Sequence, residues 1–387
     1  MEALVKLLFV FGTRPEAIKM ASLVKVMSKN SFFSVAVCVT AQHREMLDQV
    51  LDLFEITPDF DLDIMSSGQD LTTVTTKILN GTRDVLLKSK PDLVVVHGDT
   101  TTAMAASLAA CYQQIKVAHI EAGLRTGDVC SPWPEEFNRK IIADIASLHF
   151  APTSGAENNL LAEGVGSESI FVTGNTVIDS LLAVVNKLES DDALKNEVSA
   201  KFSFLRDGSK LVLITGHRRE SFGEGFRNIC AAVRQLAESH KDIDFVYPVH
   251  LNPNVLGPVS SLLEGVDNVY LIEPQDYVPF VYLMDRSYLI LTDSGGLQEE
   301  APSLGKPVLV MRENTERLEA VESGVAKLVG VDVLKIVQET ELLLVDAREY
   351  EKMSVISNPY GDGAAGKRIE GILMEHFSNE SYVSCDV

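Results

Sequence analysis

The hydrophobic residues of this chain fall into short, β-branched runs separated by longer stretches in which apolar residues recur at helical spacing. Apolar runs that alternate with amphipathic helices predict parallel sheets covered by helices on both faces. We therefore predict an α/β fold with doubly wound, Rossmann-like domains. The clearest predicted helices are residues 44–54, 102–113 and 226–238. The predicted strands are residues 6–11, 35–40, 93–97, 117–120, 170–173, 211–215, 245–249, 269–272, 289–292 and 308–311.

The alternation slackens over residues 189–208, which are polar and charged, and restarts with a fresh strand. A chain of 387 residues is long enough for two domains. We predict an N-terminal domain over 1–186 and a C-terminal domain over 187–363, with the crossing near 186–192. A last helix from about residue 364 to 377 is expected to return to the first domain, which the segment 364–387 would complete.

The composition favours a globular protein that binds neither nucleic acid nor a membrane. Hydrophobic residues make up 46% and charged residues 23% of the chain, as in ordinary globular proteins. The formal charge of −21 argues against a nucleic-acid or membrane partner, each of which would require a basic face. Five scattered cysteines without metal-ligand spacing, and the lack of a signal-like or bilayer-spanning segment, favour reduced thiols in the cytoplasm.

Candidate chemistry lies where strands end, because doubly wound sheets bind ligands outside the carboxyl ends of their strands. The first strand ends in Gly12, followed by Arg14, Pro15 and Lys19. Proline suits the first turn of a helix, whose free N–H groups and positive dipole end attract anions. Arg14 and Lys19 are therefore candidates for binding a phosphate or a sugar. A plain strand-to-helix turn with solvated charges explains this segment equally well.

Three carboxylates follow or open elements at the same predicted rim. Asp99 follows strand 93–97 after one intervening glycine, Gly98, and an N-cap is the more common explanation there. Glu121 closes strand 117–120 and has no capping role to explain it. Glu135 opens a helix, where an acidic residue is also favoured by the helix dipole. Their coincidence beside Arg14 and Lys19 predicts carboxylates that share proton transfer.

The second half carries a basic cluster after strand 211–215, made by His217, Arg218 and Arg219. This cluster suits an anionic leaving group, and its alternative is a set of solvated surface charges. His250, at the end of strand 245–249, is a weaker candidate that could be a hydrogen-bonded core histidine.

The segment 293–307 follows strand 289–292 and opens a helix with Ser294, Gly295 and Gly296. Bare backbone N–H groups at such a helix start suit a diphosphate. Glu300, one turn later, could accept hydrogen bonds from ribose hydroxyls. The sequence contains no P-loop, and the segment 223–228 lacks the third glycine of a dinucleotide fingerprint, so NAD is not expected.

Taken together, these motifs resemble a known family. The segments GTRPEAIKM, TAQHREMLDQV, HGDTTT, EAGLRTGD, SPWPEE, TGNTVID, GHRRESFG, YPVHLNPNV and DSGG-LQEEAPSLGKPV occur in this order, as in the non-hydrolysing UDP-N-acetylglucosamine 2-epimerases. The resemblance extends from about residue 6 to residue 363. It implies two Rossmann-like domains facing a central cleft in a glycosyltransferase-B-like arrangement, and a homodimer.

The resemblance also implies an activity. Members of the family interconvert UDP-N-acetylglucosamine (UDP-GlcNAc) and UDP-N-acetylmannosamine (UDP-ManNAc), which supplies bacterial surface polysaccharides. They eliminate UDP to form a 2-acetamidoglucal and then add it back after protonation from the opposite face. This route needs no redox cofactor and no obligatory metal. It requires acid and base groups around C2 and cationic groups at the departing diphosphate.

The family's functional positions map onto this sequence residue by residue, although the resemblance leaves open which carboxylate removes the C2 proton. Leu318 stands where the family usually has proline, which changes the backbone restriction on Arg317. Glu45 and Gly68 also differ from members that use a second UDP-GlcNAc as an activator. The implied catalytic residues are Asp99, Glu121, Glu135 and His217; the implied substrate contacts are Arg14, Lys19, Gln275, Phe280, Ser294, Gly295, Gly296, Glu300 and Arg317; and a possible allosteric set is Gln42, Arg218 and His250.

Three rival functions remain at the sequence level. A hydrolysing epimerase would release N-acetylmannosamine and UDP, and a glycosyltransferase on the same scaffold would transfer the sugar to an acceptor. A UDP-sugar sensor would bind without turnover, but binding an anion gains nothing from three carboxylates.

Overall fold

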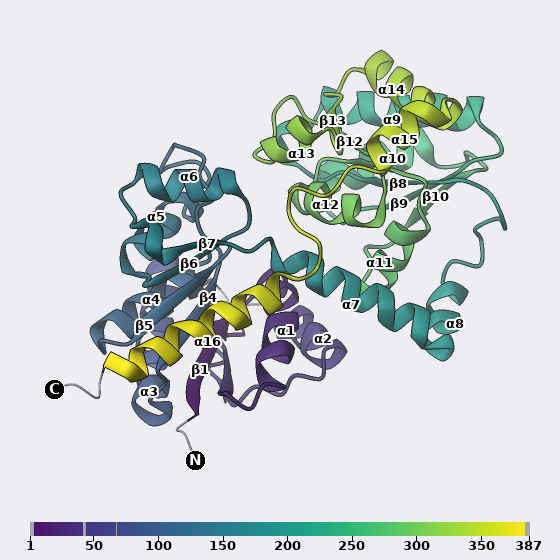
Figure 1. Cartoon of the computed structure of the whole chain (residues 1–387). Coiled ribbons are helices and arrows are strands. Elements are labelled where there is room, and N and C mark those ends of the chain that lie inside the picture. The colour runs from purple at the N-terminus through teal and green to yellow at the C-terminus, as the bar shows by residue number, and fades with distance from the viewer. Residues whose placement is uncertain (1–3, 42–43, 67, 384–387) are drawn as a thin grey trace. The chain divides into compact units, whose positions relative to one another are not determined.

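The computed structural model describes residues 4–41, 44–66 and 68–383 of the chain (Figure 1). The chain divides into two compact units. Unit 1 comprises Met1–Ser180 and Tyr360–Val387, and unit 2 comprises Leu181–Pro359.

Unit 1 is built on a parallel seven-stranded sheet with the strand order β3-β2-β1-β4-β5-β6-β7. The order reverses between β1 and β4, which is the switch point where such sheets bind ligands. The strands are β1 (Val5–Phe11), β2 (Phe33–Val39), β3 (Phe60–Asp61), β4 (Leu93–His97), β5 (Lys116–Ile120), β6 (Leu148–Ala151) and β7 (Ile170–Val172). The helices are α1 (Arg14–Ser28), α2 (Arg44–Leu53), α3 (Leu71–Ser89), α4 (Thr101–Tyr112), α5 (Glu135–Ile145), α6 (Ser154–Ala162), the short η1 (Ser167–Ser169), the start of α7 (Thr176–Ser190), and α16 (Ala365–Val383).

Unit 2 is built on a parallel six-stranded sheet with the order β10-β9-β8-β11-β12-β13. Its switch point lies between β8 and β11. The strands are β8 (Leu211–Thr215), β9 (Asp244–Pro248), β10 (Val269–Ile272), β11 (Leu289–Thr292), β12 (Val308–Val310) and β13 (Ala326–Leu328). The helical elements are α8 (Asp192–Ala200), η2 (Arg219–Ser221), α9 (Glu224–Ser239), α10 (Pro253–Leu263), α11 (Tyr277–Arg286), α12 (Gly295–Glu300), η3 (Ala301–Leu304), α13 (Leu318–Ser323), α14 (Val333–Val345) and α15 (Ala347–Ser354).

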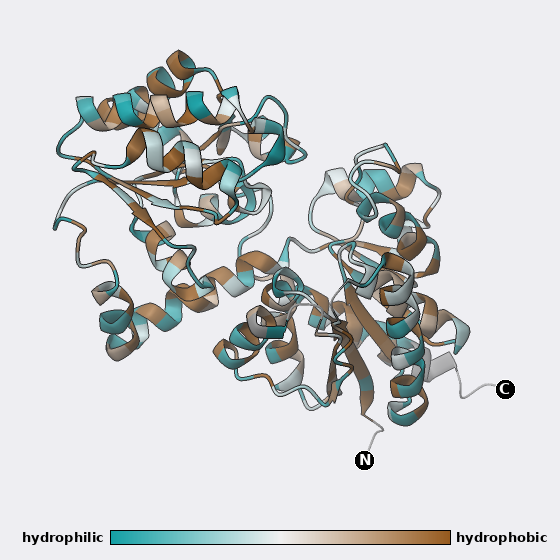
Figure 2. Ribbon diagram, turned by 180° about the vertical axis from the view of Figure 1, so that it is seen from behind, coloured by the Kyte–Doolittle hydropathy of each residue, from teal (hydrophilic) through white to brown (hydrophobic). Residues whose placement is uncertain are grey.

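The apolar runs form the two cores. Figure 2 shows the strands of both sheets in the hydrophobic colour, while the helices carry mixed colours. In unit 1, Phe9 and Phe11 of β1 are fully buried. In unit 2, Phe226 of α9 packs in one buried cluster with Phe245 and Tyr247 of β9. Burying both faces of each sheet explains why the strands read as continuous apolar runs and not as alternating patterns.

These sheets confirm the predicted doubly wound α/β class. The sequence did not predict β3, β6 and β13, all of which are short. β6 contains His149 and β13 contains Lys327, so neither reads as a continuous apolar run. Segment length and polar interruption therefore hid these strands.

The segment around the predicted crossing, 186–192, contains two helix ends separated by the extended residue Asp191. It covers the end of α7 and the start of α8, where Asp191 accepts hydrogen bonds from the backbone N–H groups of Ala193 (3.1 Å) and Leu194 (3.0 Å). The last helix, α16, belongs to unit 1, along which it runs in yellow in Figure 1. Asp179 accepts from the N–H of Gly366 at 2.8 Å and thereby holds the start of α16.

Two further findings concern the whole described part of the chain. Among residues 4–41, 44–66 and 68–383, every helix is too short or too polar to span a lipid bilayer. Cys38, Cys111, Cys130 and Cys230 are free thiols, and Cys385 lies outside the described residues.

Candidate active site

The β1–α1 turn of unit 1 is held together by Glu16, a residue that the sequence analysis did not single out. Thr13 is the N-cap of α1 and forms a capping box with Glu16. The buried Glu16 carboxylate accepts from the N–H groups of Gly12 (3.0 Å) and Thr13 (2.8 Å), and from the Thr100 hydroxyl (2.5 Å) of the neighbouring β4–α4 turn. Burial raises the pKa of Glu16 despite these hydrogen bonds. The Thr-x-x-Glu spacing was the signal that could have identified this residue.

Glu121 is the most constrained of the three candidate carboxylates. It directly follows β5 in a left-handed conformation, with φ of 61°, which costs a non-glycine residue about 1 kcal/mol. Its carboxylate forms an ion pair with Lys19, accepts from Asn175 Nδ2 at 2.9 Å and lies 3.5 Å from His97 Nε2. Burial favours the neutral acid, but the charges of Lys19 and His97 outweigh it and hold the pKa of Glu121 well below its usual value. Glu121 is therefore an anion, and Lys19 is its partner.

Asp99 is held by the first turns of α5. Arg139 donates to Asp99 Oδ2 through Nε (3.0 Å) and Nη2 (2.6 Å), and Asn138 Nδ2 donates to the Asp99 carbonyl at 2.8 Å. On its other side, Arg139 Nη1 donates to Glu136 at 2.8 Å. Burial opposes the charge on Arg139, but Asp99 and Glu136 raise its pKa nonetheless. The guanidinium thus joins the partly exposed carboxylate of Asp99 to the fully buried carboxylate of Glu136.

Glu136 anchors this group to the loop after β5. It is fully buried and accepts from the N–H groups of Thr126 (3.1 Å) and Gly127 (3.2 Å). Glu135, beside it, is the first residue of α5. Its Oε2 atom is buried and has no hydrogen-bond partner among the described residues. Leaving such an oxygen without a partner costs about 1–3 kcal/mol, which a ligand could recover.

The register of the sheet explains why Asp99 and Glu121 share a rim. His97 of β4 pairs with Ile120 of β5, so the residues after them emerge side by side. A Cβ placed on Gly98 would lie 4.0 Å from Glu121 Oε1. The structure therefore places Asp99 and Glu121 at the carboxyl end of one sheet. Glu135 opens α5, whose Asn138 and Arg139 contact Asp99.

The predicted basic residues of this rim differ in their surroundings. Arg14 is the first residue of α1, is partly exposed, and makes no ion pair within the described part of the chain. Lys19 lies on the next turn of α1 and faces Glu121. Arg14 is thus the more accessible of the two cations.

At the corresponding rim of unit 2, His217 follows β8. Its N–H and that of Arg218 donate to Asp293 Oδ2 at 2.7 Å and 2.8 Å, and its Nδ1 lies 3.5 Å from Asp293 Oδ1. The imidazole stacks on His250, with ring centroids 5.6 Å apart. Burial, followed by His250 and Arg218, lowers the pKa of His217, and Asp293 opposes this shift. His250 Nδ1 accepts from the N–H of Asn252 at 3.1 Å, which fixes its ring.

The predicted diphosphate segment forms the start of α12. Ser294 is its N-cap without a side-chain capping bond, and Gly295 and Gly296 are its first residues. A Cβ on Gly295 would lie 3.2 Å from Glu316 Oε1, so glycine permits this close approach. Glu300 Oε1 accepts from the Tyr277 hydroxyl at 3.3 Å, and burial together with Glu300 raises the pKa of that tyrosine well above its usual value.

Arg317 is held by carboxylates, although Leu318 follows it where the family usually has proline. Its Nε donates to Glu299 at 2.7 Å, its Nη1 lies 3.5 Å from Glu316, and its N–H donates to Thr315 Oγ1 at 3.0 Å. Burial would raise the pKa of Glu316, but Arg317 and a second arginine, Arg312, lower it to about 2. These contacts fix the arginine without a proline.

The remaining predicted residues are less informative. Gln275 donates from Nε2 to the Glu273 carbonyl at 2.7 Å, and Phe280 lies partly buried on α11. Gly68 has φ of 73° in the loop before α3. Gln42 lies outside the described residues. Of the possible allosteric set, the described residues are therefore Arg218 and His250, which both adjoin His217. Arg218 Nη2 lies 3.4 Å from Glu316 Oε1.

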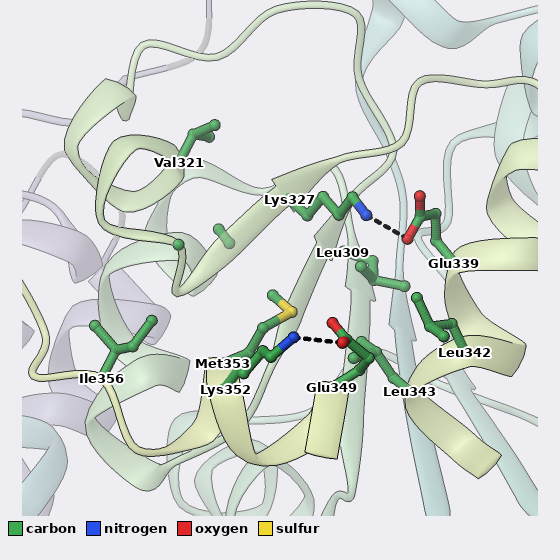
Figure 3. A pocket seen from close by; sticks show the side chains of 12 residues that line it. Leu309, Val321, Lys327, Glu339, Leu342, Leu343, Glu349, Lys352, Met353 and Ile356 are labelled. Carbon is green, nitrogen blue, oxygen red and sulfur yellow. Dashed lines mark hydrogen bonds and ion pairs between the residues drawn. The ribbon is translucent and has the colours of Figure 1, made fainter. Parts of the chain in front are cut away.

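Two pockets lie within the units, and the one in unit 1 adjoins Asn138, which contacts Asp99. A largely apolar pocket lies in unit 2, near β12, β13, α14 and α15 (Figure 3), and its volume is about 340 Å³. The ion pairs Lys327–Glu339 and Lys352–Glu349 flank it. A pocket of about 270 Å³ in unit 1 is lined by residues of α3, α4 and α5 and by Trp133. Among residues 4–41, 44–66 and 68–383, no group of His, Cys, Asp or Glu is arranged to hold a metal ion.

Comparison with known proteins gives concordant results. Residues 25–374 match the family model described as UDP-N-acetylglucosamine 2-epimerase. A UDP-N-acetylglucosamine 2-epimerase of Escherichia coli (strain K12) is 59% identical over 364 residues, which cover 94% of this chain and 97% of the relative. The crystal structure of UDP-GlcNAc 2-epimerase from Neisseria meningitidis bound to UDP-GlcNAc is 54% identical, with a TM-score of 0.88, and covers 96% of this chain and 100% of that one.

Proposed function

Because the chain belongs to the UDP-N-acetylglucosamine 2-epimerase family, we propose that it is an isomerase that interconverts UDP-GlcNAc and UDP-ManNAc without hydrolysing the product. The relatives named above support this proposal, and one of them was solved with UDP-GlcNAc bound. The observation that carries the proposal is the gathering of Asp99 and Glu121 at one rim, with Glu135 at the start of α5, because a change of configuration at carbon requires proton transfer and binding alone does not.

The proposed reaction begins with loss of UDP. A carboxylate of unit 1 takes the C2 proton, the C2–H electron pair becomes the C1=C2 double bond, and the C1–O bond breaks with its electrons on UDP. A second acidic group then delivers a proton to C2 from the opposite face while a UDP oxygen re-forms the bond to C1. We assign Glu121 the role of base, because Lys19 and His97 keep its carboxylate ionised and therefore able to accept a proton. Asp99 and Glu135 are the remaining candidates for acid and base.

Unit 2 is proposed to bind the nucleotide. The Ser294 N–H already donates to Thr292 Oγ1 at 2.9 Å, so the backbone N–H groups of Gly295 and Gly296 and the Ser294 hydroxyl would face the diphosphate. Glu300 would accept from the ribose. Gln275, Phe280 and Arg317 would complete the nucleotide contacts. His217 would donate a hydrogen bond to the departing diphosphate, which stabilises the charge that develops there. Arg14 would contact the substrate from unit 1.

We further propose that the enzyme is a cytoplasmic homodimer that supplies a bacterial surface polysaccharide. The free thiols of Cys38, Cys111, Cys130 and Cys230 agree with a reducing compartment. Light scattering on the purified chain should give twice the mass of one 42.3 kDa chain.

One experiment tests the activity. The enzyme is incubated with UDP-GlcNAc in D₂O, and the anomeric signals are followed by NMR. We expect UDP-ManNAc that carries deuterium at C2, since the returning proton comes from a group in exchange with solvent. Free N-acetylmannosamine with UDP would indicate hydrolysis, and an unchanged sugar would contradict enzymatic epimerisation.

The variant Asp99→Asn keeps the size of the side chain, and His217→Asn replaces the imidazole with a smaller, uncharged polar side chain. Both should stay folded, and each should lose turnover by a factor on the order of 10² or more. Near-normal rates in both would show that their proposed roles are wrong.

A further inference from the structure

Asp293 directly follows β11, the strand that pairs with β8, and Thr292 lies opposite Thr215 in that pairing. The side chain of Asp293 therefore emerges beside the loop that carries His217. It is fully buried, and its Oδ2 atom accepts from the N–H groups of both His217 and Arg218. A third strand adds a contact to the same loop, because the hydroxyl of Tyr247 in β9 donates to the Gly216 carbonyl at 3.0 Å.

The second carboxylate oxygen is not used by the backbone. Asp293 Oδ1 is buried and has no hydrogen-bond partner among the described residues. His217 Nδ1 lies 3.5 Å from this oxygen. The two N–H bonds to Oδ2 prevent the carboxylate from turning, so only a small rotation of the imidazole is needed to bring Nδ1 within hydrogen-bond distance. Hydrogen bonds of catalytic groups often shorten in this way when substrate binds.

We propose that Asp293 is a positioning residue for His217: it accepts the Nδ1 proton, fixes the tautomer of the imidazole and leaves Nε2 to face the substrate. This inference rests on the proposed function of His217 at the departing diphosphate. A buried carboxylate behind a histidine selects one ring orientation and stabilises the imidazolium when it forms. Once protonated, His217 can donate from Nε2 to a diphosphate oxygen while Nδ1 still donates to Asp293.

The charges around His217 support this role. The groups that face it are Asp293 from β11, His250 from the segment after β9, and Arg218 from its own loop, and Arg218 is in turn near Glu316. Burial, His250 and Arg218 all lower the pKa of His217, and Asp293 is the group that raises it. Without Asp293, the imidazolium would lose its stabilising charge.

The test variant is Asp293→Asn in the full chain. The asparagine oxygen can still accept from the two backbone N–H groups, so the loop keeps its anchor. The amide nitrogen then faces Nδ1 as a donor, which forces the imidazole into the opposite tautomer. Correlation spectra of protein labelled with ¹⁵N-histidine distinguish the two tautomers, and the signal lost in His217→Gln assigns this residue.

We expect His217 to carry its proton on Nδ1 in the wild type and on Nε2 in Asp293→Asn. Turnover should fall by a factor on the order of 10² to 10⁴, with little change in KM, because the lost interaction acts on the developing charge. The limb of the pH–rate profile that reports loss of the proton from His217 should move to lower pH, since the variant removes the group that raises the pKa of His217.

Asp244→Asn is the matched control. Asp244 is also fully buried in unit 2 and accepts from the Arg206 N–H at 3.0 Å, at the start of β9 and not at its end. This variant should leave the His217 tautomer and its pH dependence unchanged, whatever its effect on stability. A His217 that shows the same tautomer in the wild type and in Asp293→Asn would overturn the inference, as would an unchanged kcat.

The spectra need no substrate, so they separate this inference from the proposed function. A wild type that fails to epimerise UDP-GlcNAc contradicts the function even if the tautomer is as expected. A wild type that epimerises while Asp293→Asn behaves identically contradicts only the inference.

Discussion

At the scale of single residues, the three candidate carboxylates differ in what holds them, and Arg139 illustrates the energetic consequence. Its guanidinium lies between Asp99 and the fully buried Glu136. Arg139→Ala leaves Glu136 as a buried charge without its cation, which should lower the free energy of unfolding by about 3–5 kcal/mol. Chemical denaturation measures this loss. Arg83→Ala removes an exposed pair with Asp84 and should cost less than about 1 kcal/mol. Equal losses in the two variants would show that the buried pair is not structural.

A second prediction at this scale concerns Lys19 and Glu121. Lys19 lowers the pKa of Glu121 against the effect of burial, so Lys19→Met should raise it. A base with a raised pKa becomes protonated at higher pH, and the acid limb of the kcat profile should therefore move upward. The matched variant Lys29→Met removes a lysine just beyond the C-terminal end of α1 and should leave the profile unchanged. An acid limb at the wild-type pH in Lys19→Met would mean that Glu121 is not the base.

At the scale of elements, Glu16 shows how one side chain joins two strand-to-helix turns. Glu16→Ala leaves the N–H groups of Gly12 and Thr13 without their acceptor and should lower the free energy of unfolding by about 2 kcal/mol. Glu16→Gln retains an acceptor oxygen and should cost less. Because burial raises the pKa of Glu16, the wild type binds more protons when folded, and its stability should fall as pH rises from 4.5 through that raised pKa. Glu16→Gln should lack this slope in denaturation curves measured across pH.

The elements also show what a sequence can predict. Strands such as β4 and β11 were recognisable because both faces are buried, which produces an uninterrupted apolar run. The end of each apolar run also located the turn that follows the strand. Contacts such as Arg139 to Asp99, or Asn175 to Glu121, were not predictable, because they join residues far apart in sequence and depend on strand register and helix packing. Asp293 was visible as part of a motif, but its link to His217 required the pairing of β11 with β8.

At the scale of the whole molecule, a chain of formal charge −21 is proposed to bind a dianionic nucleotide sugar. Repulsion of the substrate by the net charge and attraction by individual cations near the site act over different distances. At an ionic strength of about 0.01 M the Debye length is about 30 Å, so the net charge repels the substrate, whereas at about 0.15 M it is about 8 Å and only nearby groups act. Under the proposed function, the local cations Arg14 and Arg218 then dominate. KM should therefore pass through a minimum as salt rises, first because repulsion is screened and then because these local attractions are screened.

Steady-state rates from about 0.01 M to about 1 M sodium chloride would reveal this minimum. The control is a double variant, Asp207→Lys with Glu264→Lys, at two exposed positions of unit 2 that belong to no candidate site. It changes the formal charge from −21 to about −17 and should flatten only the low-salt branch. A KM that rises steadily from the lowest salt in both proteins would mean that local cations dominate at every distance, and that the acidic surface has no effect on how the substrate arrives.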